Sequence, residues 1–159
     1  MIRGYQTIHP LEPETRGLQW GPALGAGFVA GFVLLLVPRG SPWSSLTFFS
    51  PAIMGRTLPP DSSVPMILIW LLHLLLSIGY GLIISRAVAG LTQERAILAG
   101  GVAGLVLYLL NLAFVSLVYP EIRGTEGGVV FTHIVFGLIA AGAYRGLLRR
   151  KKELATPAE

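Results

Sequence analysis

The feature that most constrains this chain is an uncharged apolar stretch, VPMILIWLLHLLLSIGYGLIIS, at positions 64–85. Its 22 residues would form a helix about 33 Å long, and the hydrocarbon core of a bilayer is about 30 Å thick. A single histidine, His73, lies near its middle, and Arg86 follows it directly. We therefore predict a transmembrane helix over 64–85, with Arg86 at the membrane edge.

Three other stretches have the same character, so the predicted fold class is all-α, a four-helix transmembrane bundle. We expect one membrane domain over 1–159, with a polar N-terminal segment at 1–17 and a basic C-terminal tail at 149–159. The first apolar stretch is not followed by a small-residue cleavage site, so we interpret it as a retained helix and not as a signal peptide. The predicted spans are 18–37, 64–85, 96–119 and 129–148.

Composition and motifs exclude several classes of protein. Hydrophobic residues make up 53% of the chain and charged residues only 13%, whereas soluble domains carry about 25% charged residues. The chain has no cysteine, which excludes disulfides, thiolate metal sites and cysteine nucleophiles. Zinc-protease, P-loop and serine-elbow patterns are absent from the sequence, so we expect a protein that is not an enzyme.

The distribution of basic residues predicts the orientation of the helices. With both termini in the cytoplasm, the inner segments hold nine Lys and Arg residues and the outer loops hold three. Five of the nine lie together at the end of the last span, which indicates a topology signal and an anionic-lipid contact, not a groove for nucleic acid. These five are Arg145, Arg149, Arg150, Lys151 and Lys152.

The first outer loop, 38–63, is rich in proline and has an apolar middle at 43–55. That middle is too apolar for a free aqueous loop and too short to span a bilayer. We predict an interfacial or re-entrant segment with its aromatic residues at headgroup depth. It either covers a cavity or simply lies on the bundle.

Glycines recur at spacings of about four within the predicted spans. In lipid, small residues let two helix backbones approach closely. The glycine faces therefore predict helix packing, either within the bundle or against a second copy. The candidate packing residues are Gly21, Gly25, Gly27, Gly31, Gly100, Gly104 and Gly137.

Three polar side chains lie in apolar surroundings within the predicted spans: His73, Asn111 and His133. Intramembrane polar residues are costly, so they are candidates for a site. The two histidines are candidate ligands of a shared haem b or metal. The alternative is that each neutral ring hydrogen-bonds to a neighbouring helix, for example to Asn111 or to a backbone carbonyl. Tyr80 and Tyr108 add hydroxyl groups.

Glu126 precedes His133 by seven residues, which is two helical turns. The pair would share one face at the outer mouth of the bundle, where histidine can sense pH. His133, Glu126 and Asn111 are therefore candidates for a pH sensor or a polar gate. The alternative is that Glu126 is a solvated loop carboxylate.

The second half of the chain, about 64–152, carries a series of short motifs. They are His73 with Gly79-Tyr80, the Ala/Gly-rich run 97–104, the loop after Pro120, Glu126 with His133 and Gly137, and Tyr144-Arg145 before the basic tail; Ser41-Pro42 lies after the first span. In these motifs the chain resembles the YagU-like family of uncharacterised bacterial inner-membrane proteins. The resemblance implies a bacterial inner-membrane location with this topology, and a link to acid tolerance.

Taken together, these features predict a small non-enzymatic integral membrane protein, structural or accessory, in a complex or a homo-oligomer. Its expected partners are the lipid bilayer and other membrane subunits or a second copy of itself, and not nucleic acid. One alternative is a small channel or transporter-like protein linked to acid stress and gated near His133 and Glu126. A second alternative is an electron carrier with a haem b held by His73 and His133.

Overall fold

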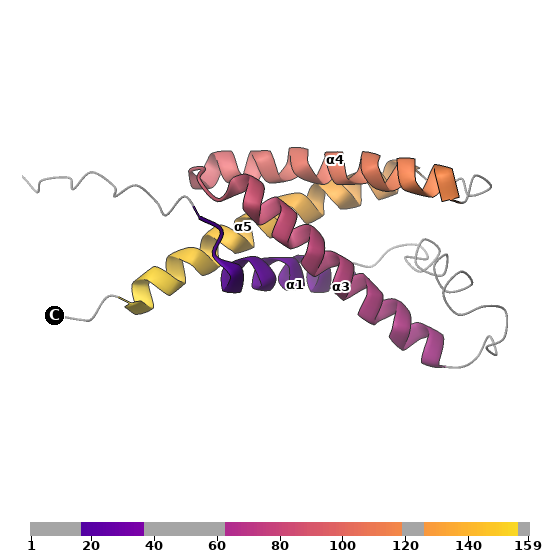
Figure 1. Cartoon of the computed structure of the whole chain (residues 1–159), viewed down its shortest axis with the longest axis horizontal. Coiled ribbons are helices and arrows are strands. Elements are labelled where there is room, and N and C mark those ends of the chain that lie inside the picture. Colours follow the sequence, from indigo (N-terminus) through magenta and orange to yellow (C-terminus); the bar gives the residue numbers. More distant parts are fainter. Residues whose placement is uncertain (1–16, 37–62, 119–125, 156–159) are drawn as a thin grey trace, which may run out of the picture.

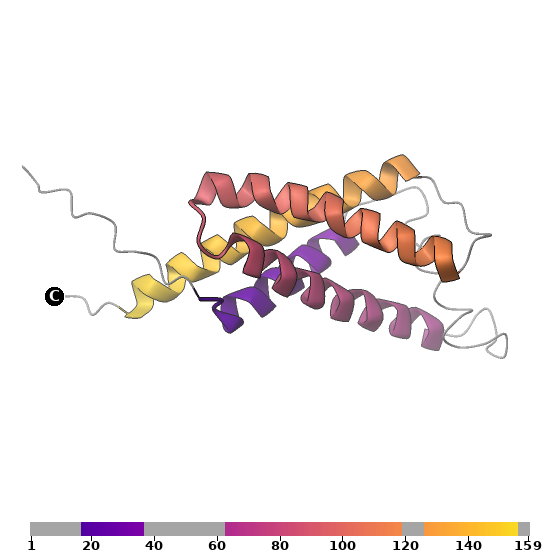
Figure 2. The ribbon, with the colours of Figure 1, turned by 45° about the horizontal axis from the view of Figure 1, so that its top comes forward.

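The computed structural model describes residues 17–36, 63–118 and 126–155, and four helices account for nearly all of them (Figure 1). Successive helices run in opposite directions, so the start of α1, the α3–α4 turn and the end of α5 lie at the same end of the bundle (Figures 1 and 2). The helices are α1 (Trp20–Leu36), α3 (Ser63–Val88), α4 (Gln93–Val118) and α5 (Glu126–Ala155).

The predicted all-helical class is confirmed, and three of the four helices, α3, α4 and α5, are long and apolar enough to cross a membrane. α1 is apolar but has only 17 residues, which corresponds to about 25 Å and is shorter than a typical hydrocarbon core. The predicted segment at 43–55 lies outside the described residues.

The last helix is longer than predicted, because it continues through the first part of the basic tail to Ala155. Arg149 donates to Glu153 one turn later at 3.0 Å. Such pairs, together with the good helix formers Leu, Arg, Lys, Glu and Ala, favour a helix even where no apolar face is buried.

The helix ends follow from local chemistry. At the start of α1 the amide of Ala23 bonds to the carbonyl of Gln19 at 3.0 Å, and Pro22 lies in the first turn, where proline is tolerated. The short turn at 89–92 joins α3 to α4. The amide of Ala96 bonds there to the carbonyl of Thr92 at 2.8 Å. This short connection makes α3 and α4 antiparallel neighbours.

The closest helix pairs are α4 with α5 and α1 with α3. α1 also packs along α5, and α3 touches both α4 and α5, whereas no contact joins α1 to α4 among the described residues. α3 and α5 therefore meet across the middle of the bundle (Figure 2).

Small residues let the backbones of α1 and α3 touch. A Cβ added to Gly81 would collide with the Cα atom of Gly27. A Cβ on Gly27 would lie 2.6 Å from the carbonyl oxygen of Ser77, and one on Gly31 would lie 2.5 Å from the Cβ atom of Ser77. Any larger side chain at these positions would have to push the two helices apart.

The α4–α5 pair uses the same device. A Cβ on Gly104 would collide with the carbonyl oxygen of His133, and a Cβ on Gly137 would collide with the carbonyl oxygen of Gly100. A Cβ on Gly100 would also lie 2.5 Å from the Cβ atom of Ala141. These glycines are thus buried in contacts between helices of one chain.

Two of the predicted packing glycines lie elsewhere. A Cβ on Gly25 would lie 2.9 Å from a methyl group of Leu147 on α5, and a Cβ on Gly21 would meet nothing within 4 Å. Gly81 was not among the predicted packing residues, although its backbone makes one of the tightest contacts. Its sequence context, Gly-Tyr-Gly, does not distinguish it from Gly79, which has open space beside it.

The two helix pairs are related by an internal repeat. The run AGFVAGFVLLL at 26–36 in α1 and the run AGGVAGLVLYL at 99–109 in α4 share eight of eleven residues. The run IGYGLI at 78–83 in α3 likewise matches IVFGLI at 134–139 in α5. α1 with α3 and α4 with α5 are therefore two versions of one helical hairpin, and the helices in corresponding places run in the same direction (Figure 1).

The outer faces of the bundle are apolar on all four helices. Large exposed side chains include Phe28 and Phe32 on α1, Leu75 on α3, Leu98 on α4 and Phe131 on α5. A continuous apolar exterior of this kind fits contact with lipid chains or with other membrane helices.

The glycine contacts lead to a first prediction. Gly81→Ala should lower the free energy of unfolding by about 2 kcal/mol. The new methyl group would collide with the backbone of Gly27, and backbone atoms cannot move aside as a flexible side chain can. Gly79→Ala, on the same helix and in open space, should be neutral or stabilising by up to about 1 kcal/mol. Unfolding in mixed micelles would measure both, and equal stabilities would contradict the close contact.

Candidate functional site

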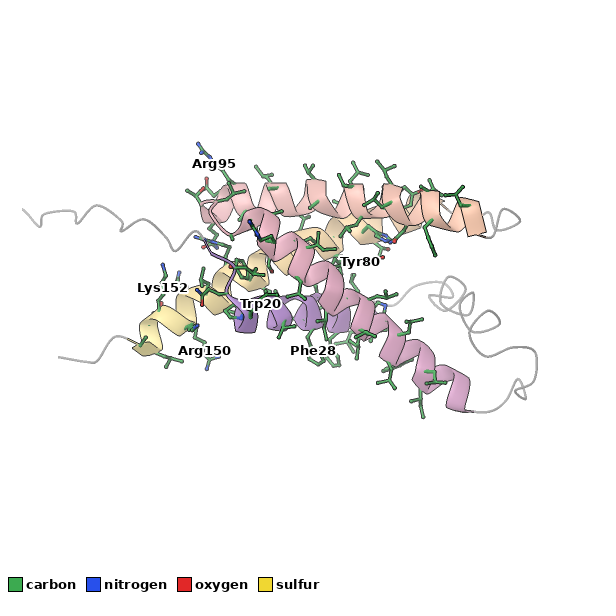
Figure 3. The ribbon with its side chains drawn as sticks, viewed as in Figure 1. Trp20, Phe28, Tyr80, Arg95, Arg150 and Lys152 are labelled. Atoms are coloured by element: carbon green, nitrogen blue, oxygen red, sulfur yellow. The ribbon has the colours of Figure 1, made fainter. Side chains whose placement is uncertain are left out.

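Three polar side chains meet where α3, α4 and α5 come together. The hydroxyl of Tyr80 on α3 donates to Oδ1 of Asn111 on α4 at 2.5 Å. Nδ2 of the same Asn111 lies 3.0 Å from Nε2 of His133 on α5. All three side chains are half-buried. We call this set, Tyr80, Asn111 and His133, the polar triad, and Figure 3 labels Tyr80 within it.

The hydrogen bonds of the triad have a defined direction. Because Oδ1 of Asn111 accepts from the Tyr80 hydroxyl, its Nδ2 must be the group that faces His133. An amide nitrogen only donates, so Nε2 of His133 accepts. A ring that accepts at Nε2 carries its proton on Nδ1, because a proton on Nε2 would place two donors face to face.

Neighbouring contacts hold the triad in place. Gly104 lets the backbone of α5 at His133 approach α4 closely. The ring of Tyr108 meets the His133 ring edge-on, with centroids 5.7 Å apart. Tyr80 in turn meets the buried Phe136 edge-on at 6.3 Å. Geometries of this kind are favourable for aromatic rings, so an aromatic contact lies beside the polar contacts at both Tyr80 and His133.

His73 lies in a different contact. Its Nε2 is 3.1 Å from the carbonyl oxygen of Gly31, so the ring donates from α3 to the backbone of α1. His73 precedes Tyr80 by seven residues on the same helix, about 10 Å along the axis. The structure therefore brings His133 together with Asn111 and Tyr80, and it does not bring His73 into that set.

The separation bears on the candidate haem or metal ligands. Nε2 of His73 bonds to a carbonyl and Nε2 of His133 bonds to an amide, so a shared ligand would require both rings to give up these partners. Among the described residues, no group of three or more His, Cys, Asp or Glu side chains is placed to hold a metal ion. The hydrogen bonds match the alternative in which each ring bonds to a neighbouring helix.

We predicted that Glu126 lies close to His133, but the Glu126 side chain is not among the described side chains. α5 begins at Glu126, which places it two turns before His133 on one helix, but the position of its carboxylate is not described. Its part in a pH sensor stays a prediction.

Sequence reasoning named Asn111 as a possible hydrogen-bond partner of the histidines, but it did not join Asn111 and His133 to Tyr80. The available signal was the short list of polar side chains in apolar spans, because such groups find one another when lipid offers no partner. Compared with known proteins, the chain matches no family model, and no curated protein or solved structure resembles it. The resemblance to the YagU-like family therefore stays a prediction.

The triad yields a second prediction. Asn111→Leu removes both hydrogen bonds, and at roughly 0.6–1.7 kcal/mol for each interhelical bond it should cost about 1–3 kcal/mol of unfolding free energy. Tyr80→Phe removes one bond and should cost about half as much. Leu110→Ala, at the adjacent exposed position, should change stability by less than about 0.5 kcal/mol. If the Asn111 and Leu110 variants behave alike in micelle unfolding, the triad contributes nothing to stability.

Proposed function

We propose that this protein is a small multi-pass membrane protein of structural or accessory type, working as a subunit of a membrane complex or as a homo-oligomer. The observation that carries the proposal is that its interior polar groups tie helices to one another. The triad joins three helices, and His73 joins a fourth by bonding to the backbone of α1. Polar groups used in this way stabilise a helix arrangement.

The surface of the bundle supports the same proposal. The outer faces carry large apolar side chains on every helix, which suit lipid or partner helices. α1 is short for a bilayer, and neighbouring helices of a complex would help to accommodate such a segment, since a helix shorter than the hydrocarbon core can respond by oligomerising.

The proposed location is a bacterial inner membrane with both termini in the cytoplasm. The excess of basic residues near the start of α1, the α3–α4 turn and the end of α5 supports this orientation, because cytoplasmic segments are rich in Lys and Arg. In support of it, these three places lie at the same end of the bundle (Figure 1).

The experiment that tests the proposal is extraction from native membranes in a mild detergent, followed by measurement of the particle's mass and content. We expect a particle much larger than the 17.0 kDa chain, with defined further subunits or several copies. The Asn111→Leu variant should assemble less completely, and Leu110→Ala should assemble normally. A particle with a single copy of this chain would contradict the proposal.

A second candidate function is a pH-dependent channel or transporter, and the proton position on His133 favours it. Protonation of Nε2 would break the bond to Asn111 and, through that side chain, disturb the bond to Tyr80. The titratable groups that contact the ring include Tyr108 of α4 and, through Asn111, Tyr80 of α3. A proton reaching His133 would thus loosen the junction of three helices.

For this candidate we expect a flux in proteoliposomes that increases as the pH falls and is lost in His133→Ala. His73→Ala serves as the matched control, because it removes a histidine from the α1–α3 contact and leaves the triad intact. A flux that is unchanged in the His133 variant would rule out gating by the triad.

A further inference from the structure

Every charged side chain that the structure describes lies at one end of the bundle. Seven are cations and two are carboxylates. They belong to the α3–α4 hairpin near its turn and to the last turns of α5. Figure 3 labels three of them, Arg95, Arg150 and Lys152, together with Trp20. The set, which we call the basic belt, consists of Arg86, Arg95, Arg145, Arg149, Arg150, Lys151 and Lys152, with Glu94 and Glu153 among them.

The belt residues come from three helices at the same end of the bundle. Arg86 lies two residues before the end of α3, and Arg95 lies two residues after the start of α4. These helices meet in a short turn, so the two side chains start from similar heights. On α5, Arg145 precedes Leu147 and the other four cations follow it, and Leu147 packs beside Gly25 of α1.

Tertiary contacts fix part of this arrangement. Nζ of Lys151 donates to Oε1 of Gln19 at 2.9 Å, and the amide of Gln19 donates to the hydroxyl of the buried Tyr144 at 3.3 Å. The start of α1 is thereby held against the end of α5. Trp20, which follows Gln19, is 66% exposed, so an indole ring lies beside the belt.

The carboxylates offset only a small part of the positive charge. Glu153 pairs with Arg149 at 3.0 Å. Arg86, Arg95, Arg150 and Lys152 are exposed, and one further carboxylate, Glu94, lies among the cations. The end of the bundle therefore carries a large positive excess directly next to its apolar faces.

We propose that the basic belt binds the headgroups of anionic phospholipids and gathers such lipids around this end of the bundle. The inference rests on the membrane placement proposed above. Guanidinium and ammonium groups suit phosphate oxygens, and Trp is enriched at headgroup depth. Cations on three helices at the end of an apolar bundle complement the headgroups of one leaflet, whereas an acidic protein would need the charge gathered on one face.

Trp20 provides a reporter for this surface. In the double variant Trp43→Phe/Trp70→Phe, Trp20 is the sole tryptophan, and acyl-brominated lipids that reside beside it quench its fluorescence. We expect quenching by brominated phosphatidylglycerol to indicate binding about fivefold or more tighter than for phosphatidylcholine, the effect of about one basic side chain near an anionic surface. The preference should weaken at high ionic strength.

The chain offers matched controls. Trp70 is 41% exposed in the first half of α3, away from the belt, so the protein with only Trp70 should show a ratio near one. Arg150→Gln/Lys152→Gln should lower the ratio at Trp20 several-fold. Arg149→Gln/Glu153→Gln removes an ion pair without changing the net charge, and it should preserve the ratio.

The outcomes separate the two proposals. If neither lipid quenches either tryptophan, the membrane placement fails. If both lipids quench Trp20 equally, or if the ratio survives removal of Arg150 and Lys152, the placement stands and the anionic-lipid site is overturned. In that case the belt acts only in setting the orientation of the chain.

Discussion

Backbone contact between helices is the constraint on which the rest of this structure depends. Gly27 and Gly81 bring α1 against α3, and Gly100 and Gly137 bring α4 against α5. In lipid there is little hydrophobic gain from pairing helices, so close packing and hydrogen bonds must hold them together. Glycine supplies the packing, because without side chains two backbones meet over a continuous surface.

The polar triad depends on that packing. Gly104 allows α5 to approach α4 at His133, and only then can Asn111 reach the imidazole while it accepts from Tyr80. The triad also links the two halves of the internal repeat, since Tyr80 belongs to the first hairpin and the other two residues to the second. Close packing within each hairpin is thus combined with hydrogen bonding between the hairpins. A shift of the helices within one hairpin would therefore change the hydrogen bonds that join it to the other.

The sequence predicted the positions of the helices better than the contacts between them. Hydropathy identified the apolar helices, but the last predicted span ended at 148, whereas α5 continues to Ala155. Spacing selected Gly27, Gly31, Gly100, Gly104 and Gly137, yet it could not rank Gly81 above Gly79. The role of a glycine depends on which atoms of a neighbouring helix it faces, and the residues next to it in the sequence do not determine those atoms.

The sequence by itself determined the all-helical class, the concentration of charge near the chain ends and the turn, and the few polar side chains within apolar helices. Helix formation and hydropathy are local properties, so they can be read from neighbouring residues. Only the tertiary structure decided that His133 bonds to Asn111 while His73 bonds to the carbonyl of Gly31. The choice depends on which helix faces each ring, and helix packing sets that through contacts between residues far apart in the chain.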